Sequence, residues 1–136
     1  MQIKIGYPPR LSPGPVDGRW FRPPPGYSKL NVDGSFQDGK ATYGGLLRDT
    51  EGNWVWGYTG FCGFTSPLHA ELMSLKEGLL ALLQCRHLHI IVESDSSEAV
   101  NLINGFPDEE HSLLSVVLEC KSIHSLLRSS SITYVP

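Results

Sequence analysis

The stretch KLNVDGSF, residues 29–36, has the pattern of a β-strand with an acid in its middle. Apolar and polar side chains alternate along it, which is typical of a strand with one buried face. Asp and Gly are depleted from strands, so backbone preference does not explain Asp33 or Gly34. Two interpretations are open. Either the strand ends early in an Asp-Gly turn, or Asp33 is a carboxylate held on a rigid element for a chemical purpose.

The segments that follow predict two more strands and then a change of period. Residues 42–48 and 53–61 have strand patterns and are joined by a turn at residues 49–52, which predicts an antiparallel meander of three strands. Residues 67–85 carry one leucine stripe, which predicts an amphipathic helix. The stripe consists of Leu68, Leu72, Leu75, Leu79 and Leu82.

The second half of the chain adds two strands and two helices to this prediction. Residues 88–92 form a short apolar run, the signature of a strand covered on both faces. Residues 95–104 and 112–128 predict helices, and residues 131–135 predict a last strand. The order β-β-β-α-β-α-α-β predicts an α/β fold, in which helices pack on a mixed five-stranded sheet.

Length and composition fit a single globular domain. The chain has 136 residues, of which 40% are hydrophobic. Seven of its ten prolines fall within the first 25 residues, a density that blocks regular structure. We therefore expect residues 1–26 to be a Pro-rich tail or linker and residues 27–136 to form the domain.

Two kinds of targeting segment are not visible in the sequence. No apolar run approaches the roughly 20 residues that a membrane span needs. The first residues, MQIKIGYPPR, lack the apolar core and cleavage site of a signal peptide. An intracellular location, in the nucleus or the cytoplasm, is therefore the default expectation, and no contact with a membrane is expected.

The charge balance is acidic over the predicted domain. Residues 27–136 hold seven Lys and Arg against thirteen Asp and Glu, and the basic residues are not clustered. Tight, purely electrostatic binding of nucleic acid depends on cations that neutralise phosphates. The sequence therefore argues against binding of that kind.

Two further acids are placed where they would approach the predicted sheet. At about 100° per residue, Glu71 falls close to the edge of the leucine stripe, whereas Glu77 lies opposite the stripe and is expected to be exposed. Asp95 directly follows the buried strand, and ligands in α/β folds collect at the carboxyl ends of strands. Ordinary explanations stay open for both acids. Glu71 fits a first-turn acid favoured by the helix dipole, and Asp95 fits an N-cap in a capping box with Glu98.

Taken together, the three acids predict a metal site. Asp33 is in mid-strand, Glu71 is on the sheet-facing edge of a helix, and Asp95 is at the end of a central strand. Divalent cations such as magnesium take carboxylate oxygens as ligands, and paired ions stabilise the attacking and leaving oxygens in phosphoryl transfer. Without a cation, the clustered carboxylates would repel one another.

Three motifs, in this order and spacing, resemble the plant ribonuclease H-like domain of the reverse-transcriptase-associated group. They are NVDGSF, SPLHAELMSLKEGL and VESDSSEAVNLI. The segments WFRPPPGYSKLNVDGS and GGLLRDTEGNWVWG resemble the same family, so the resemblance covers residues 20–136. It implies a five-stranded mixed sheet flanked by helices, in a family found in retroelement-derived and stand-alone proteins. Catalytic members of that family cut the RNA strand of RNA–DNA hybrids, using two magnesium ions held by an Asp-Glu-Asp-Asp set.

The resemblance also implies roles for individual residues. Asp33, Glu71 and Asp95 would be the catalytic ligands of Mg²⁺, or alternatively of Mn²⁺. Asp33 would bridge the two ions, Glu71 would help position the ion of the attacking water, and Asp95 would hold the ion on the side of the first strand. Gly34 and Ser35 would contact the substrate, and Gly34 would let the nucleic-acid backbone approach closely.

The sequence departs from the family pattern in two places. In the family, a strand like ITYVP continues into a final helix that bears the fourth Asp, whereas this chain ends at Pro136. We therefore expect a C-terminally truncated domain with weak or absent activity. Pro67 and Leu68 stand where members that grip hybrids well often carry an Asn pair, and their side chains form no hydrogen bonds to bases. Weak binding of a hybrid or of RNA is expected.

Three functional interpretations follow. The first is a magnesium-dependent ribonuclease for RNA–DNA hybrids. The second is a non-catalytic module that keeps the fold for nucleic-acid or protein contacts. The third is an inactive relic of a retroelement. The sequence does not specify an oligomeric state.

Overall fold

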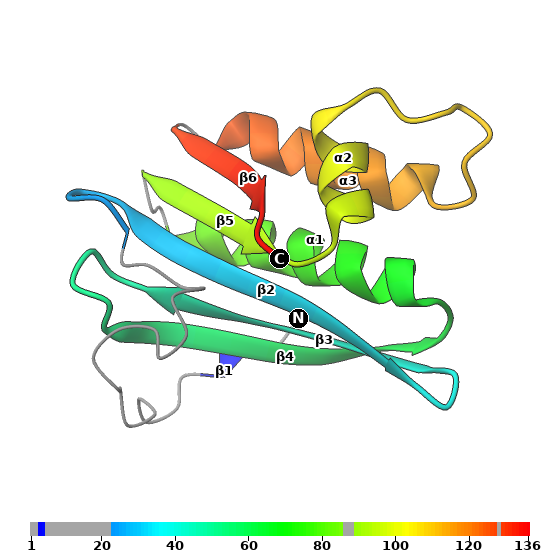
Figure 1. The fold of residues 1–136 in the computed structure, drawn as a ribbon, viewed down its shortest axis with the longest axis horizontal. Helices are drawn as coiled ribbons and strands as arrows, with labels where there is room; N and C mark the ends of the chain where they lie inside the picture. The colour runs from blue at the N-terminus through cyan, green and yellow to red at the C-terminus, as the bar shows by residue number, and fades with distance from the viewer. Residues whose placement is uncertain (1–2, 5–22, 86–88, 128) are drawn as a thin grey trace.

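Strand β2 (Ser28–Gln37) lies inside a mixed sheet and pairs differently on its two sides. On one side it pairs antiparallel with β3 (Lys40–Arg48), which pairs antiparallel with β4 (Trp54–Phe64). On the other side it pairs parallel with β5 (Ile90–Ser94), which pairs parallel with β6 (Ser130–Tyr134). The predicted meander and the predicted mixed sheet are therefore confirmed (Figure 1).

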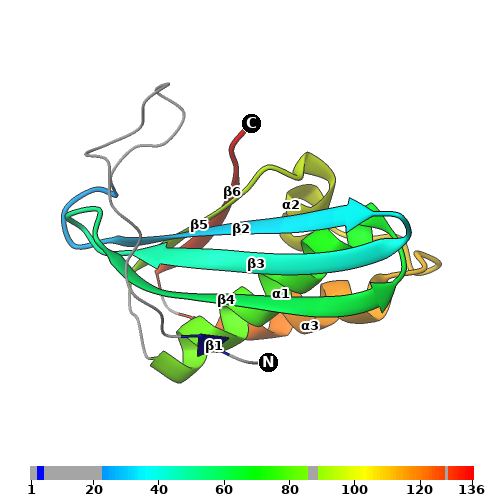
Figure 2. The ribbon, with the colours of Figure 1, turned by 90° about the horizontal axis from the view of Figure 1, so that it is seen from below.

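Three helices of the described part of the chain complete the fold in the predicted order. They are α1 (Pro67–Cys85), α2 (Ser97–Asn104) and α3 (Leu114–Leu126). Helix α1 packs on β2 and β3, α3 packs on α1, and α2 contacts α3 and β6. Figure 2 shows α1 and α3 on the same side of the sheet. We call the opposite side of the sheet the open face.

The structure, a computed structural model, describes residues 3–4, 23–85, 89–127 and 129–136. Within these residues the sheet has a sixth strand, β1 (Ile3–Lys4), which pairs with β4 at the edge. A two-residue strand is too short to leave a pattern in the sequence, so it was not predicted. Most of the predicted tail, residues 1–26, lies outside the described residues, and the boundary near residue 27 stays a prediction.

Strand β2 does not end at Asp33 and Gly34. It continues to Gln37, and the tight turn to β3 is made instead by Asp38 and Gly39. Both turn residues have positive φ, at 52° and 77°, as a type I′ hairpin turn requires. The interpretation of an early Asp-Gly turn at residues 33–34 is therefore wrong, and Asp33 is an acid within a strand.

Helix α1 is buried on two sides, which corrects the prediction for Glu77. Four leucines of the stripe are fully buried and Leu68 is partly buried, but a second line of small residues is buried as well. This line consists of Ala70, Ser74, Gly78 and Ala81. Glu77 is only 8% exposed rather than solvent-facing, because it adjoins this second line and because Tyr43 and Tyr58 of the sheet lie close to it.

The core lies between the sheet and the helices. Its largest fully buried side chains come from β2, β3, α1, β5 and α3, and include Leu30, Leu47, Leu79, Val92 and Val117. None of the helices that the structure describes is long and apolar enough to cross a membrane.

Candidate metal centre

Asp33 lies on β2 just beyond the point where its parallel neighbour ends. The pairing of β2 with β5 ends at Val32 and Ser94, whereas β2 continues along β3, with Asp33 opposite Gly44. From Asp33 onward, the edge of β2 that faces β5 is therefore not paired with any strand of the described residues. This opening lets side chains of other elements reach the backbone of β2.

Glu71 of α1 uses this opening. The backbone N–H of Gly34 donates a hydrogen bond to Glu71 Oε1 at 3.2 Å. A Cβ atom at Gly34 would lie 2.6 Å from the carbonyl carbon of Ala70 and 2.6 Å from the nitrogen of Glu71. Only glycine therefore lets the first turns of α1 pack this closely against β2, and that close packing brings Glu71 to the strand.

Asp95 follows β5, between the strand and α2. The N-cap of α2 is Ser96, whose Oγ accepts a hydrogen bond from the backbone N–H of Ala99 at 3.2 Å. The Oγ of Ser94 in turn accepts a hydrogen bond from the N–H of Ser96 at 3.1 Å. The interpretation of Asp95 as the N-cap is therefore wrong, because a neighbouring serine has that role.

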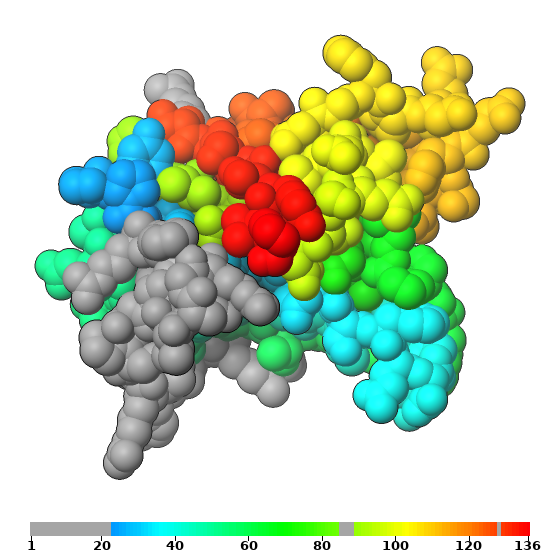
Figure 3. All heavy atoms as spheres, in the orientation of Figure 1, coloured from blue at the N-terminus to red at the C-terminus, as the bar shows by residue number. Residues whose placement is uncertain are grey.

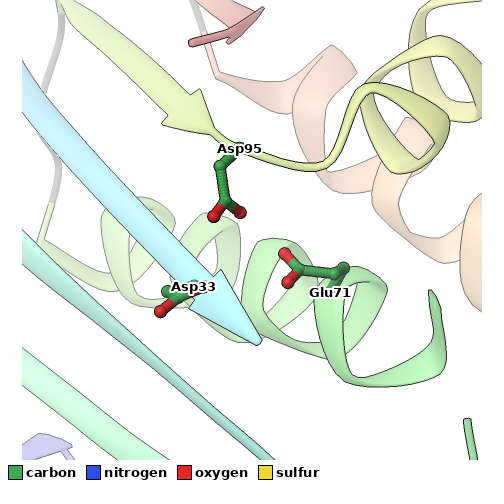
Figure 4. A group of neighbouring side chains, drawn as sticks. All are labelled: Asp33, Glu71 and Asp95. Atoms are coloured by element: carbon green, nitrogen blue, oxygen red, sulfur yellow. The ribbon is translucent and has the colours of Figure 1, made fainter. Parts of the chain in front are cut away.

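The three predicted acids meet at one point. Asp33, Glu71 and Asp95 each offer a carboxylate oxygen, and these oxygens lie within 4.8 Å of one another. Figure 4 shows the three side chains as neighbours, on β2, on α1 and at the end of β5. Asp33 and Asp95 are exposed, whereas Glu71 is half-buried. The cluster is therefore open to solvent on one side and closed by protein on the other.

The electrostatics of this carboxylate cluster are unfavourable without a cation. Burial, followed by the charges of Asp95 and Asp33, raises the pKa of Glu71 to about 7, although the N–H of Gly34 lowers it. Burial and the charge of Asp95 also raise the pKa of Asp33. The second oxygen of Glu71, Oε2, is buried without a hydrogen-bond partner among the described residues. A buried carboxylate oxygen of this kind is costly unless a cation or a donor approaches it.

The donor set fits a divalent cation. Three carboxylates from three elements supply oxygen ligands and negative charge, which hard ions such as Mg²⁺ and Mn²⁺ prefer. The unpartnered Oε2 of Glu71 is available as a ligand atom. The arrangement is thus compatible with metal binding.

A pocket of about 230 Å³ adjoins the carboxylate cluster. Its lining includes Asp33 and Asp95, together with Asn31, Val32, Glu93, Ser94, Val135 and Pro136. Within it, Glu93 accepts a hydrogen bond from the Asn31 side chain at 3.0 Å and forms an ion pair with Lys29 at 3.3 Å. The sequence reasoning missed this polar group. The signal was present, because Lys29 and Asn31 alternate with the apolar residues of β2 and so share the face of Asp33.

The two predicted substrate residues lie on opposite faces of β2. Gly34 faces α1, so packing of the helix explains why a glycine is needed there. Ser35 alternates with Gly34, faces the open side of the sheet and is exposed. Contact of either residue with a substrate stays a prediction.

Comparison with known proteins identifies the family. Residues 31–136 match the family described as reverse transcriptase-like. A curated Arabidopsis thaliana protein, named provisionally as a ribonuclease H protein, is 31% identical over 103 residues. The match covers 74% of this chain and 17% of that relative, so this chain spans about a sixth of the relative's length.

Solved ribonuclease H structures share the fold at low sequence identity. RNase H1 from the archaeon Halobacterium salinarum superposes with a TM-score of 0.74 at 20% identity, covering 81% of this chain and 86% of that one. The N-terminal RNase H domain of a Mycobacterium tuberculosis protein gives 0.73 at 21%, covering 81% and 82%. LC11-RNase H1, solved in complex with an RNA/DNA hybrid, gives 0.70 at 19%, covering 80% and 85%. The chain therefore belongs to the reverse transcriptase-like family and has the ribonuclease H fold.

Proposed function

We propose that this chain hydrolyses the RNA strand of RNA–DNA hybrids, using divalent metal ions held by Asp33, Glu71 and Asp95. The observation that carries the proposal is the convergence of three carboxylate oxygens within 4.8 Å. The raised pKa of Glu71 and its unpartnered Oε2 support it, because both indicate negative charge in need of a cation. The family and the fold are those of ribonuclease H proteins.

The three acids would have complementary tasks at this site. Bound divalent ions would polarise the phosphate of the substrate and activate the attacking water, which is the general chemistry of two-metal phosphoryl transfer. Asp33, on a rigid strand, fixes one carboxylate at the edge of the open face. The N–H of Gly34 orients Glu71, and the turn held by Ser94 and Ser96 places Asp95.

The proposed substrate is a hybrid that binds weakly. LC11-RNase H1, which shares the fold, was solved with an RNA/DNA hybrid. The acidic balance of residues 27–136 weakens electrostatic attraction to phosphates. Pro67 and Leu68, at the start of α1, offer no side-chain hydrogen bonds to bases. Mg²⁺ is the proposed ion, and Mn²⁺ is an alternative.

Cleavage of a labelled RNA–DNA hybrid, first with Mg²⁺ and then with Mn²⁺, tests the proposal. The wild-type chain is expected to cut the RNA strand, and Asp33→Asn is expected to lose the activity. Asp108→Asn is the matched control, because Asp108 lies on the exposed loop between α2 and α3 and an Asn oxygen can still accept the N–H of Glu110. Absence of metal-dependent cleavage by the wild-type chain would contradict the proposal.

A second candidate function is a binding module without catalysis. The observation that favours it is that the carboxylate cluster contains three acids among the described residues, whereas Glu93 nearby is already paired with Lys29. Under this alternative the chain binds the hybrid, and no cleavage occurs with either ion. If the hybrid is neither bound nor cut, the chain is better described as an inactive derivative of a retroelement.

A further inference from the structure

Two exposed phenylalanines sit side by side at the end of β4. The side chains of Phe61 and Phe64 are 58% and 75% exposed. Their ring centroids lie 6.1 Å apart, and the rings meet edge to face at 90°. An isolated exposed apolar residue needs no explanation, but two large aromatic residues in contact on the surface often mark a binding site.

Strand register places both rings on the open face, which also carries Asp33. Ser35 of β2 lies opposite Thr42 of β3, which lies opposite Phe61 of β4. One row further along, Gln37 lies opposite Lys40, which lies opposite Phe64. Because Asp33, Ser35 and Gln37 alternate along one strand, their side chains point the same way. A register shift between the two rows leaves Cys62 as an extra residue on β4, so Phe61 and Phe64, three residues apart, share this face and their rings meet.

The aromatic pair lies close enough to the carboxylate cluster for one bound nucleic-acid strand to contact both. Two residues along β2 span about 7 Å. The two strand spacings from β2 across β3 to β4 add up to about 10 Å. Phe61 is therefore roughly 12 Å from Asp33 across the sheet. Figure 3 looks onto the open face and shows the β2–β3 hairpin, in cyan, uncovered beside the C-terminal residues, in red.

The surface between Asp33 and the two rings is polar and hollowed. An open hollow of about 360 Å³ is lined by Ser35, Gln37, Asp38, Lys40 and Thr42. Lys40 supplies a positive charge, and the hydroxyl and amide groups supply hydrogen-bond donors for phosphate or sugar oxygens. This combination of a cation, polar donors and exposed rings is the chemistry with which proteins hold single-stranded nucleic acid.

We propose that Phe61 and Phe64 form a stacking platform for unpaired bases of a nucleic-acid strand that continues from the carboxylate cluster, with Lys40 beside its phosphates. The ligand is single-stranded, because bases in a duplex are already stacked and do not offer their faces to a protein ring. Continuity with the carboxylate cluster and the polar hollow between them favour nucleic acid over a protein partner. The inference extends the proposed function and rests on it only for the type of ligand.

Binding of a short fluorescein-labelled oligo-dT strand, followed by anisotropy in Mg²⁺ buffer, tests the platform. This probe is not a substrate of the proposed activity, which cuts only RNA. Phe61→Ala and Phe64→Ala should each weaken binding at least fivefold, whereas Phe61→Tyr should bind like the wild type because it keeps the ring. Phe106→Ala is the matched control, since Phe106 is a fully exposed phenylalanine far along the chain, on the loop between α2 and α3.

Two further comparisons separate stacking from charge. An abasic strand of the same length keeps its phosphates but has no bases, so its affinity should not change in Phe61→Ala. Lys40→Ala should reduce the slope of log affinity against log salt by about 0.7, the value for one phosphate contact on a single strand. Equal sensitivity of the abasic strand and oligo-dT to Phe61→Ala would overturn the stacking role.

Self-association is the competing use of the patch. If the wild-type chain dimerises in sedimentation experiments, and the Phe61→Ala/Phe64→Ala variant is monomeric with unchanged oligo-dT affinity, the platform proposal is wrong. Failure of the platform proposal can be told apart from failure of the proposed nuclease function. Oligo-dT binding that depends on both rings, without hybrid cleavage, would retain the platform and reject the nuclease.

Discussion

Glu71 is a carboxylate held close to two others at the junction of α1 and β2. Its Oε1 accepts the N–H of Gly34, and its Oε2 is buried without a partner among the described residues. Burial and the charges of Asp95 and Asp33 raise its pKa to about 7. A side chain in this state lowers stability in the metal-free protein, which is common where a group is placed for function rather than for folding.

Glu71→Gln should therefore stabilise the metal-free protein while removing its response to metal. The amide oxygen can keep the hydrogen bond from Gly34, and the new amide N–H groups can donate to Asp33 or Asp95. We expect an increase of up to about 1 kcal/mol in the free energy of unfolding in EDTA, after allowing for solvent screening. Urea unfolding with and without Mg²⁺ measures both effects. A lower stability in EDTA than that of the wild type would contradict the account.

The same residue predicts the pH dependence of the metal-free protein. The pKa of Glu71 is raised from an ordinary value of 4.5 to about 7, so the folded state holds the proton more tightly than the unfolded chain does. The contribution of protonated Glu71 to the free energy of unfolding is fully present below pH 4.5 and is lost as the pH rises through about 7. The difference in unfolding free energy between Glu71→Gln and wild type should therefore grow over this range. A difference that is constant with pH would contradict the assigned cause.

Gly34→Ala tests the close approach of α1 to β2. A Cβ atom there would lie 2.6 Å from backbone atoms of Ala70 and Glu71, which cannot move without shifting the helix. We expect a loss of at least about 2 kcal/mol in the free energy of unfolding, together with weaker metal binding. Ser35→Ala, one residue along on the exposed face, should be nearly neutral in urea unfolding. Equal stability of the two variants would show that the packing here is looser than described.

Among the elements, the connection between β5 and α2 contains two neighbouring residues with different roles. Ser96 caps α2, and Asp95 is left to face the carboxylate cluster. Ser96→Ala should cost about 1 kcal/mol of stability, because the N–H of Ala99 loses its acceptor. Thermal unfolding measures this loss, and Ser122→Ala, at an exposed position of α3, serves as a reference. A Ser96→Ala variant as stable as this reference would contradict the assignment of the cap.

The contact between β2 and β5 contains a charged pair on the open face. Lys29 and Glu93 form an ion pair at 3.3 Å, with side chains only 7% and 12% exposed. Lys29→Met should cost about 3 kcal/mol, because it leaves the charge of Glu93 without its cation. Adding Glu93→Met should restore most of the loss, since both charges are then absent. Denaturant unfolding of Lys29→Met, Glu93→Met and the double variant measures the coupling, and additive losses would contradict it.

The elements of the domain could largely be predicted from the sequence, and their side-chain environments only in part. Helix α1 was predicted with its observed bounds, because its leucine stripe and flanking residues are unambiguous. Glu77 was expected to be exposed, because a single stripe does not reveal that small residues on the other side of α1 also pack. An N-cap role was left open for Asp95, whereas Ser96 caps the helix; both residue types are good N-caps and stand side by side, so the pattern alone does not separate them.

At the scale of the whole molecule, topology assembles the site. The sheet order places β2 between β3 and β5, and the early end of β5 leaves the edge of β2 open to Glu71. Sequence patterns placed the three acids on the correct elements, but only the packing of α1 onto β2 shows that their oxygens meet within 4.8 Å. The aromatic pair of Phe61 and Phe64 was not predicted, because its position depends on register across three strands.

The proposed function depends on the binding of a divalent ion by Asp33, Glu71 and Asp95 together. Titration of the isotope-labelled protein with Mn²⁺, followed by amide NMR spectra, tests it directly, because this paramagnetic ion broadens signals near its binding site. We expect the amide signals of Gly34, Glu71 and Asp95 to broaden first, and we expect Glu71→Gln to prevent this broadening. Broadening that instead centres on the acidic loop at residues 108–110, and persists in Glu71→Gln, would contradict the assignment of the metal centre.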